Sequence, residues 1–405
     1  MTVPDTRRPL WRGRALALTG ILLVALNLRS AVASLSPLVE RIQVDIPISP
    51  VALGLLGSAP PVCFAIFGVL TPLLARRVGL ERLLVIAIIV LSLSLCLRGT
   101  ATTAGLLLTA TVAIFAGVAV GNVVLPPLVK KYFPDRIGLV TTMYMTAMAF
   151  STFIPPLVAV PVADAVGWRW ALAQWGVVAA VAVVPWVALL LRARAGRADE
   201  VHTAAAGPAV RRLWASPMAW AIAVLFTTSS ITAYTMFAWA PTMLVQVAGV
   251  PAREAGARLS LFAIVGLPLS LFVPLLTARL GIVKTIVGVA TGGLAAGYLG
   301  LIFVPDAAPW LWILLIALSQ ALFPLALVLV NLRTRSHEAS VALSGFVQSV
   351  GYAIAAAFPI GIGAVVQATG GWTAPLWMLL CTAPIAALAG LVAARPRAIE
   401  QDLRR

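Results

Sequence analysis

Residues 71–80 read TPLLARRVGL, and residues 273–282 read VPLLTARLGI. The two stretches align without a gap at a spacing of 202 residues, and each one ends an apolar run in a short basic turn. Further matches occur at a spacing of 204 residues, and they pair Pro155 with Pro359, Gly167 with Gly371 and Trp168 with Trp372. Self-similarity at a fixed spacing indicates an internal repeat. The chain is therefore predicted to consist of two related halves.

The composition of this 405-residue chain is that of a membrane protein. Apolar residues make up 61% of the chain and charged residues only 10%, whereas soluble domains carry about 25% charged residues. The mean hydropathy is +1.03. These values exclude a soluble enzyme, a disulfide scaffold and a disordered protein, and the continuous apolar runs exclude the alternating strands of a porin. We therefore predict an all-α polytopic membrane protein.

Twelve apolar runs approach or exceed the length of about 20 residues that a membrane-spanning helix needs. They cover residues 15–38, 50–75, 83–99, 104–129, 138–163, 168–191, 216–247, 256–278, 283–304, 308–332, 340–367 and 372–394. The longest hydrophilic stretch divides these runs six and six. The predicted organisation is therefore a six-helix bundle over residues 1–191, a cytoplasmic linker over 192–215 and a second, pseudo-symmetric six-helix bundle over 216–405.

Basic residues are concentrated on one side of the predicted spans. With both termini in the cytoplasm, the inside connections and tails contain 23 lysines and arginines. The outside connections contain five: Arg41, Arg98, Arg169, Arg253 and Arg258. The positive-inside rule therefore predicts cytoplasmic termini in the inner membrane of a prokaryote. Because topology explains the net charge of +16, we predict no nucleic-acid partner.

Three short motifs carry a resemblance to a known family. Residues 27–29 read NLR, residues 121–126 read GNVVLP, and LRTR at 332–335 is followed by LSGFVQSVGY at 343–352. With these motifs and its twelve spans, the chain resembles the major facilitator superfamily, and within it the cyanate permease and 2-nitroimidazole exporter branch. The resemblance implies a transporter that works by alternating access around a central cavity, which agrees with the parallel repeat.

The loop between the second and third spans departs from the pattern of that family. The family's loop reads G-x-x-x-D-R-x-G-R-R, whereas this chain has Pro72 at the first glycine and Arg76 at the aspartate. An acid-based latch is therefore not carried over to this loop. The basic, turn-forming character is kept, and the expected gating residues are Arg76, Arg77, Gly79, Arg279 and Gly281.

Arg29 is the one charge that the sequence places clearly at membrane depth. It follows Ala15 by 14 residues, which corresponds to about 21 Å along a helix, beyond the midplane of a hydrocarbon core about 30 Å thick. Buried charges in membranes are usually functional, so we expect the guanidinium to face the cavity and bind an anionic or polar solute. Snorkelling to the outer surface is the alternative. Asn27 is expected to share part of the same wall.

The thirteen acids all fall in termini or connections between the predicted spans. Proton-coupled transporters commonly carry a titratable side chain inside a span, so coupling through a buried carboxylate is not expected. The two histidines also fall in connections, and the three cysteines lie apart in apolar runs. We therefore expect no metal, no cofactor and no enzymatic activity.

Several uncharged polar and aromatic residues lie near the middle of predicted spans. Gln348 and Tyr352 are four residues apart and so share a helix face, and Tyr144 occupies the position equivalent to Gln348 in the other half. Each candidate has an alternative role in helix packing or in the aromatic belt. The candidates for the cavity wall are Asn122, Tyr144, Tyr234, Trp239, Gln320, Gln348 and Tyr352.

The leading hypothesis is a monomeric secondary transporter for a small anionic or polar solute. The resemblance implies a cyanate-like anion or a nitroimidazole-like compound, and the anion agrees better with Arg29. The alternative is a broad-specificity drug efflux pump. That class favours an apolar or acidic cavity suited to lipophilic cations, and no acid inside a predicted span supports it.

Overall fold

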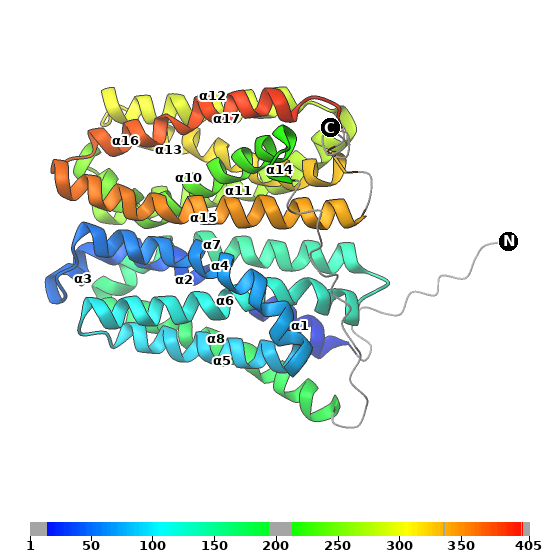
Figure 1. Cartoon of the computed structure of the whole chain (residues 1–405). Coiled ribbons are helices and arrows are strands. Elements are labelled where there is room, and N and C mark those ends of the chain that lie inside the picture. Colours follow the sequence, from blue (N-terminus) through cyan, green and yellow to red (C-terminus); the bar gives the residue numbers. More distant parts are fainter. Residues whose placement is uncertain (1–13, 194–212, 335–336, 398, 400–405) are drawn as a thin grey trace.

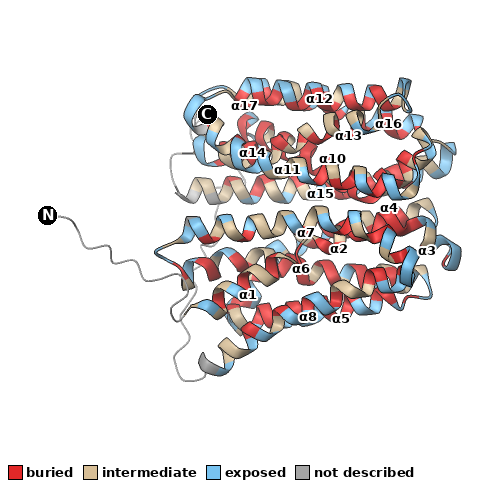
Figure 2. Cartoon of the chain, turned by 180° about the vertical axis from the view of Figure 1, so that it is seen from behind, coloured by how far each residue is buried: buried red, intermediate tan, exposed pale blue. Residues whose placement is uncertain are grey.

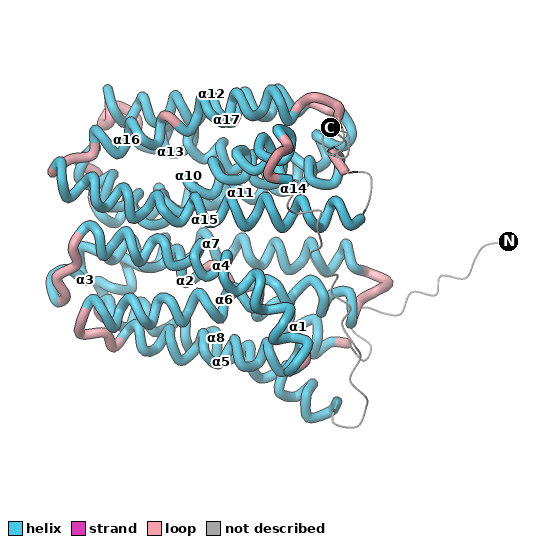
Figure 3. Tube along the Cα trace, in the orientation of Figure 1, coloured by secondary structure: helices cyan, strands magenta, loops and turns pink. Residues whose placement is uncertain are grey.

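The computed structural model describes residues 14–193, 213–334, 337–397 and 399. Every regular element in these residues is a helix (Figure 3). Most of the predicted linker, residues 194–212, lies outside the described residues.

The first half begins with a segmented span. Its parts are α1 (Ala15–Ala25), α2 (Ser30–Leu35), the 3-10 turn η1 (Ser36–Leu38) and α3 (Val39–Asp45). The half continues with α4 (Pro50–Val78), α5 (Leu80–Gly99), α6 (Ala104–Tyr132), α7 (Ile137–Val166) and α8 (Trp168–Ala193).

The second half has a segmented fourth span. Its helices are α10 (Pro217–Ala248), α11 (Ala252–Leu280), α12 (Val283–Phe303), α13 (Pro309–Ala317), the 3-10 turn η2 (Leu318–Ala321), α14 (Leu322–Leu332), α15 (His337–Thr369), α16 (Thr373–Leu380) and α17 (Thr382–Ala393). Together the described residues provide twelve spans long and apolar enough to cross a membrane. The predicted fold class is confirmed.

The two halves lie as two layers, in which α4 and α7 of the first half pack against α15 and α11 of the second, respectively (Figure 1). The beginning of α1 and the end of α17 lie at the same end of the molecule (Figure 1). We call this the terminal end, and the end with Asp45 and Trp372 the far end. Buried residues fill the inside of each layer, and exposed residues lie on its outer surface (Figure 2). Exposed apolar side chains such as Leu93 and Phe303 are suited to contact with lipid.

Equivalent contacts in the two halves support the repeat. The turns that contain Gly79 and Gly281 both place glycine at positive φ, with values of 88° and 64°, a conformation that glycine adopts without steric cost. At the far end the indole of Trp168 donates a hydrogen bond of 2.9 Å to Asp45. The indole of Trp372 likewise donates one of 2.6 Å to Gln246.

Glycines let α4 and α15 approach closely near the far end. Gly54 and Gly57 lie directly against Pro359, and Gly363 lies against Pro50. A hydrogen bond of 2.6 Å from Ser58 Oγ to the carbonyl of Ala356 also joins the two halves here. Small residues permit such contact between helices in membranes. We call this region, Pro50–Ser58 on α4 and Ala356–Gly363 on α15, the far-end seam.

The same faces of α4 and α15 lose contact toward the terminal end. Gly68 follows Gly54 by 14 residues and Gly345 precedes Gly363 by 18 residues, so each pair shares a helix face. Among the described residues, no atom of another element lies within 4 Å of the position that a Cβ would take on Gly68 or Gly345. The halves are therefore closed at the far end and separated at these positions near the terminal end.

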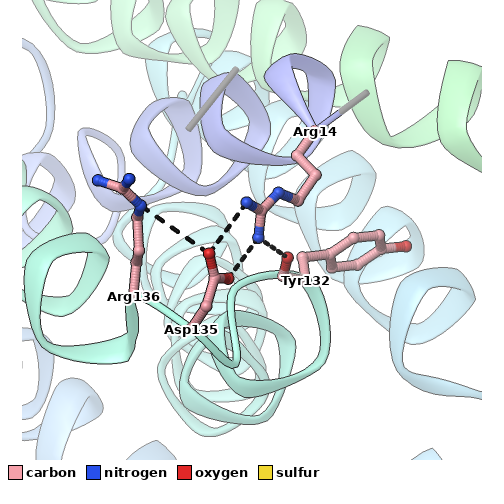
Figure 4. Close-up of polar contacts among 4 residues, drawn as sticks. All are labelled: Arg14, Tyr132, Asp135 and Arg136. Atoms are coloured by element: carbon pink, nitrogen blue, oxygen red, sulfur yellow. Dashed lines mark hydrogen bonds and ion pairs between the residues drawn. The ribbon is translucent and has the colours of Figure 1, made fainter. Parts of the chain in front are cut away.

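Salt bridges bind elements within the first half at the terminal end. Arg14 donates hydrogen bonds to both carboxylate oxygens of Asp135 and one to the carbonyl of Tyr132 (Figure 4). The guanidinium of Arg14 also lies 5.1 Å from the centre of the Phe133 ring. Hydrogen bonds from Arg14 hold the pKa of Asp135 below its ordinary value. Arg136 is 3.9 Å from the same carboxylate.

Two sequence-based placements are wrong. The five basic residues predicted in outside connections lie within helices instead: Arg41 in α3, Arg98 in α5, Arg169 in α8, and Arg253 and Arg258 in α11. Of these, Arg98 is fully buried. Several acids expected in connections lie instead in the end turns of helices: Glu40, Asp45, Glu81, Asp164 and Glu254. Helix ends extend beyond the apolar runs because polar residues at the membrane surface continue the helical hydrogen bonding.

Candidate functional site

The first span is interrupted at the depth of Arg29. Residues 26–29 form a turn between α1 and α2, and Arg29 has φ −121° and ψ −15°. Asn27 donates from its backbone N–H to Val24 and from Nδ2 to the carbonyl of Leu23 at 2.8 Å. Ser30 Oγ donates to the carbonyl of Asn27. Discontinuous helices frame substrate sites in transporters, so the interruption marks this region as a candidate site.

Arg29 lies among aromatic side chains from both halves. Its guanidinium carbon is 5.8 Å from the centre of the Phe64 ring on α4. The guanidinium also interacts electrostatically with the hydroxyl groups of Tyr234 on α10 and Tyr352 on α15. Arg29 is half-buried, and no ion pair with a carboxylate is found for it among the described residues. The guanidinium therefore retains donors for a ligand.

The rings around Arg29 form a continuous aromatic wall. The Tyr352 ring centre lies 5.7 Å from that of Phe64, 6.2 Å from Tyr234 and 5.1 Å from Phe226. Phe64 and Tyr234 are 6.4 Å apart. We call Arg29, Phe64, Tyr234, Tyr352 and Phe226 the Arg29 cluster. One cation, two phenol hydroxyls and several ring faces can together hold a small polar or anionic solute with a flat shape.

Two further hydroxyl groups lie on the Tyr234 face of α10. Thr227 and Ser230 precede Tyr234 by seven and four residues, which places all three within about 60° of one another around the helix. Both hydroxyls are buried and have no hydrogen-bond partner among the residues that the structure describes. By contrast, Thr232 on another face donates to the carbonyl of Thr228. Leaving a buried hydroxyl without a hydrogen bond costs about 1–3 kcal/mol of free energy. A hydrogen bond to a ligand or to water would remove this cost, so both hydroxyls are available for one.

The remaining predicted residues lie around this cluster in different ways. Gln348 is half-buried one turn from Tyr352 and donates a hydrogen bond of 2.8 Å to Ser344. Tyr144 is buried in the core of the first half. Asn122 donates to the carbonyl of Val118 in its own helix. Their predicted place in the cavity wall remains a prediction.

Trp239 and Gln320 contact the protein backbone. Trp239 is buried, and its indole donates a hydrogen bond of 3.1 Å to the carbonyl of Pro359. Gln320 lies in the η2 turn and donates to the carbonyl of Phe262, and Gly266 leaves room for its amide. Both contacts match the packing alternative for these residues. Neither residue has a described ring or ion contact with the Arg29 cluster.

The predicted gating residues lie at the terminal end. Arg76, Arg77 and Arg279 are exposed in the last turns of α4 and α11, next to Gly79 and Gly281. Their positions agree with basic turns at one membrane surface. A role in gating is not tested by these positions.

The described residues contain no group of three or more histidine, cysteine or acidic side chains that could hold a metal ion.

A family model for the Major Facilitator Superfamily matches residues 17–356. The chain belongs to the Major Facilitator Superfamily. The membership agrees with the twelve spans and the two layers, and identifies the protein as a membrane transporter.

Three bacterial transport proteins resemble the chain along most of its length. It is 32% identical to the uncharacterized transporter YycB of Bacillus subtilis (strain 168), over 95% of each chain. It is 30% identical to the 2-nitroimidazole transporter of Escherichia coli (strain K12), over 96% of this chain and 98% of that one. It is 24% identical to the cyanate transport protein CynX of the same bacterium, over 87% and 90%. The predicted resemblance to this branch is confirmed.

A solved major facilitator shares the fold. The crystal structure of a bacterial homolog to the human lysosomal transporter Spinster, in an inward-facing and occupied conformation, superposes with a TM-score of 0.73. The two chains are 16% identical, and the match covers 98% of this chain and 99% of the other.

The sequence-based reasoning missed Phe64, Phe226, Thr227 and Ser230. The two phenylalanines lie in apolar runs, where their composition does not distinguish a cavity wall from a lipid-facing surface. The two hydroxyls could have been found, because TTSSIT at 227–232 is an unusual concentration of polar residues inside a span and the spacing to Tyr234 is helical.

Proposed function

We propose that this major facilitator is a secondary transporter of small anionic or strongly polar solutes, which it binds at the Arg29 cluster. The supporting observation is the half-buried guanidinium of Arg29, which has no ion pair with a carboxylate among the described residues and interacts electrostatically with two tyrosines of the other half. A charge at membrane depth is costly unless a partner offsets it. An anionic solute would supply the missing partner.

The same charge argues against a broad-specificity pump for lipophilic cations. Such a solute would meet the guanidinium of Arg29 without a nearby carboxylate to balance it, and like charges at close range repel. The names of two relatives, a 2-nitroimidazole transporter and a cyanate transport protein, support a small polar or anionic solute. Within that class, the aromatic wall favours flat solutes.

Four groups of the cluster have proposed roles toward the solute. Arg29 donates charge-assisted hydrogen bonds to the solute, and Tyr234 and Tyr352 bind its polar edge from the second half. Phe64 packs against its face. Asn27, Tyr144, Gln348 and Asn122 are proposed as the outer parts of the wall, while Trp239 and Gln320 hold the surrounding helices in place.

Alternating access would use the difference between the two ends of the molecule. The far-end seam is closed, whereas α4 and α15 are separated near the terminal end. We therefore propose that the structure represents a state open toward the terminal end, and that this end faces the cytoplasm in an inner membrane. The orientation follows the sequence-based prediction, in which the inside connections and tails contain 23 basic residues and the outside connections five.

Topology is tested by labelling single cysteines in a variant whose three native cysteines are replaced. Pro134→Cys lies in the exposed connection before α7 at the terminal end, and Thr102→Cys lies in the exposed connection before α6 at the far end. A membrane-impermeant thiol reagent added to intact cells should label Cys at 102 and leave Cys at 134 unlabelled until the cells are opened. The reverse pattern would contradict the proposed orientation.

Solute class is tested by counterflow in liposomes that contain the purified protein. Cyanate and 2-nitroimidazole serve as probes, and a lipophilic cation, tetraphenylphosphonium, serves as the comparison. We expect exchange of at least one of the first two and none of the cation. Exchange of the cation alone would favour the efflux pump.

Elution as a single protomer in detergent would support the predicted monomer.

A further inference from the structure

Arg98 lies in a membrane-spanning helix, and the protein buries it completely. It lies near the end of α5 with 0% of its surface exposed. Nη1 donates a hydrogen bond of 3.1 Å to the carbonyl of Ala31, and Nη2 donates one of 3.1 Å to Ser34 Oγ. Both acceptors belong to α2, the short helix that starts directly after Arg29.

The burial of Arg98 is energetically unfavourable on its own. In the part of the chain that the structure describes, no carboxylate forms a salt bridge with it, and its Nε has no hydrogen-bond partner. Transfer of an unpaired charge out of water costs several kcal/mol even after relaxation. A leucine at this position would avoid that cost, so the guanidinium needs a function that its two hydrogen bonds provide.

The interruption of the first span explains what those bonds can do. On the α1 side, Ser151 of α7 donates a hydrogen bond of 3.3 Å to the carbonyl of Ala25. After Leu26 the α-helical bonding gives way to tighter turns, in which the N–H groups of Asn27 and Leu28 donate to the carbonyls of Val24 and Ala25. The position of α2 is therefore not fixed by continuous α-helical bonding from α1. Ser151 of α7 therefore binds the first span before the interruption, and Arg98 of α5 binds it after the interruption, at α2.

The geometry of α2 relates Arg98 to Arg29. Ala31 and Ser34 are three residues apart and share one face of α2, the face that Arg98 contacts. Arg29 precedes Ala31 by two residues, which corresponds to about 200° around a helix. The guanidinium of Arg98 thus fixes the rotation of α2 about its axis by binding one face of the helix. Arg29 extends from the opposite face, at the beginning of α2.

We propose that Arg98 is a positioning residue that sets the direction of the Arg29 guanidinium toward Tyr234 and Tyr352. The proposal rests on the proposed function of Arg29 as the group that binds the solute. Arg98 itself does not contact the solute. Its effect on binding is transmitted through α2, and it therefore depends on the presence of Arg29.

A double-mutant cycle tests this dependence. Dissociation constants for cyanate and 2-nitroimidazole are measured for the unchanged protein, Arg98→Met, Arg29→Ala and the double variant. Methionine fills much of the volume without donating hydrogen bonds. We expect Arg98→Met to weaken binding about tenfold when Arg29 is present, the loss of roughly one well-placed hydrogen bond. In the Arg29→Ala background the same change should have less than about a twofold effect.

Two further variants control for stability and for arginine chemistry. Arg98→Lys keeps the charge but loses the fork, so it should bind more weakly than the unchanged protein and more tightly than Arg98→Met. Arg169→Met removes a far-end arginine that binds Asp45 at the end of the first span, the span that contains α2. This change should leave both dissociation constants unchanged. Thermal unfolding of every variant shows whether it is folded.

The outcomes separate the two proposals. An equal loss of affinity in both backgrounds, or no loss in either, would contradict the positioning role of Arg98. Failure of both Arg98→Met and Arg98→Lys to fold would contradict it too, since the requirement would then be structural. If Arg29→Ala alone leaves binding unchanged, the proposed function of Arg29 fails, whatever the Arg98 variants do.

Discussion

Arg29 and Tyr234 belong to different halves of the protein, and the guanidinium of the first interacts with the hydroxyl of the second. Arg29 lies at the interruption of the first span, and Tyr234 lies in α10, the first span of the second half. A rocking motion of the halves would change the distance between the two groups. A solute bound to both would therefore couple its own binding to the relative position of the halves, as alternating access requires.

The tyrosine hydroxyls should contribute measurably to affinity. Tyr234→Phe and Tyr352→Phe each remove one hydroxyl and retain the ring, so the aromatic wall is preserved. We expect each change to weaken binding of an anionic probe by about two- to tenfold, the net worth of one hydrogen bond. Isothermal titration calorimetry on purified protein measures this. Tyr132→Phe, at a tyrosine bonded to Glu81 near the terminal end, should leave the affinity unchanged, and a loss there equal to the others would contradict the assignment.

Enlarging Gly57 should open the far-end seam. A side chain at this position collides with Ala238 and with Pro359 of the second half, so Gly57→Val should shift the population toward states open at the far end. The readout is the labelling rate from outside intact cells of Ser36→Cys, a buried position lining a small cavity between the halves. We expect a several-fold rise, reflecting a shift of about 1–2 kcal/mol. Gly288→Val faces open space and should not change the rate.

The Arg14–Asp135 pair should make stability depend on pH at the acidic end. Because Arg14 lowers the pKa of Asp135 below its ordinary 3.8, the pair stabilises the folded state above that value and loses its effect as the pH falls further. Asp135→Asn should lower the melting temperature at neutral pH by about one or two degrees. The difference between variant and unchanged protein should shrink below about pH 3.5. A constant difference would contradict this, and Asp306→Asn, an exposed far-end acid, provides the control.

The sequence was sufficient for the fold because each determinant is local or repeated. Apolar runs set the number of spans, and the matched turns at Gly79 and Gly281 revealed the two halves. Arg29 could be predicted as a site residue since a lone charge in an apolar run is visible without any structure. Tyr234 and Tyr352 were predicted as candidates for a similar reason, as polar groups near the middle of their spans.

Other parts of the site depend on which helix faces which. Phe64 and Phe226 became part of the cluster only because α4 and α10 turn those faces toward Tyr352, and nothing in an apolar run specifies that direction. Gln320 is held by a carbonyl of α11, a contact between segments far apart in the chain. Arg98 was misplaced because a charge at the end of an apolar run resembles a surface residue. Its acceptors on α2 exist only through the interruption of the first span.

The affinity of the Arg29 variants for an anionic probe tests the central claim most directly. Dissociation constants for cyanate are measured by calorimetry for the unchanged protein, Arg29→Lys and Arg29→Ala, each first shown to be folded. A charge-assisted hydrogen bond is worth about 1.5–3 kcal/mol, so alanine should weaken binding by about 10- to 150-fold, while lysine, which keeps the charge but not the planar fork, should recover only part of the loss. Nearly identical constants for all three proteins would remove Arg29 from the binding site, and full recovery by lysine with only a mild effect of alanine would indicate a side chain that merely reaches the membrane surface.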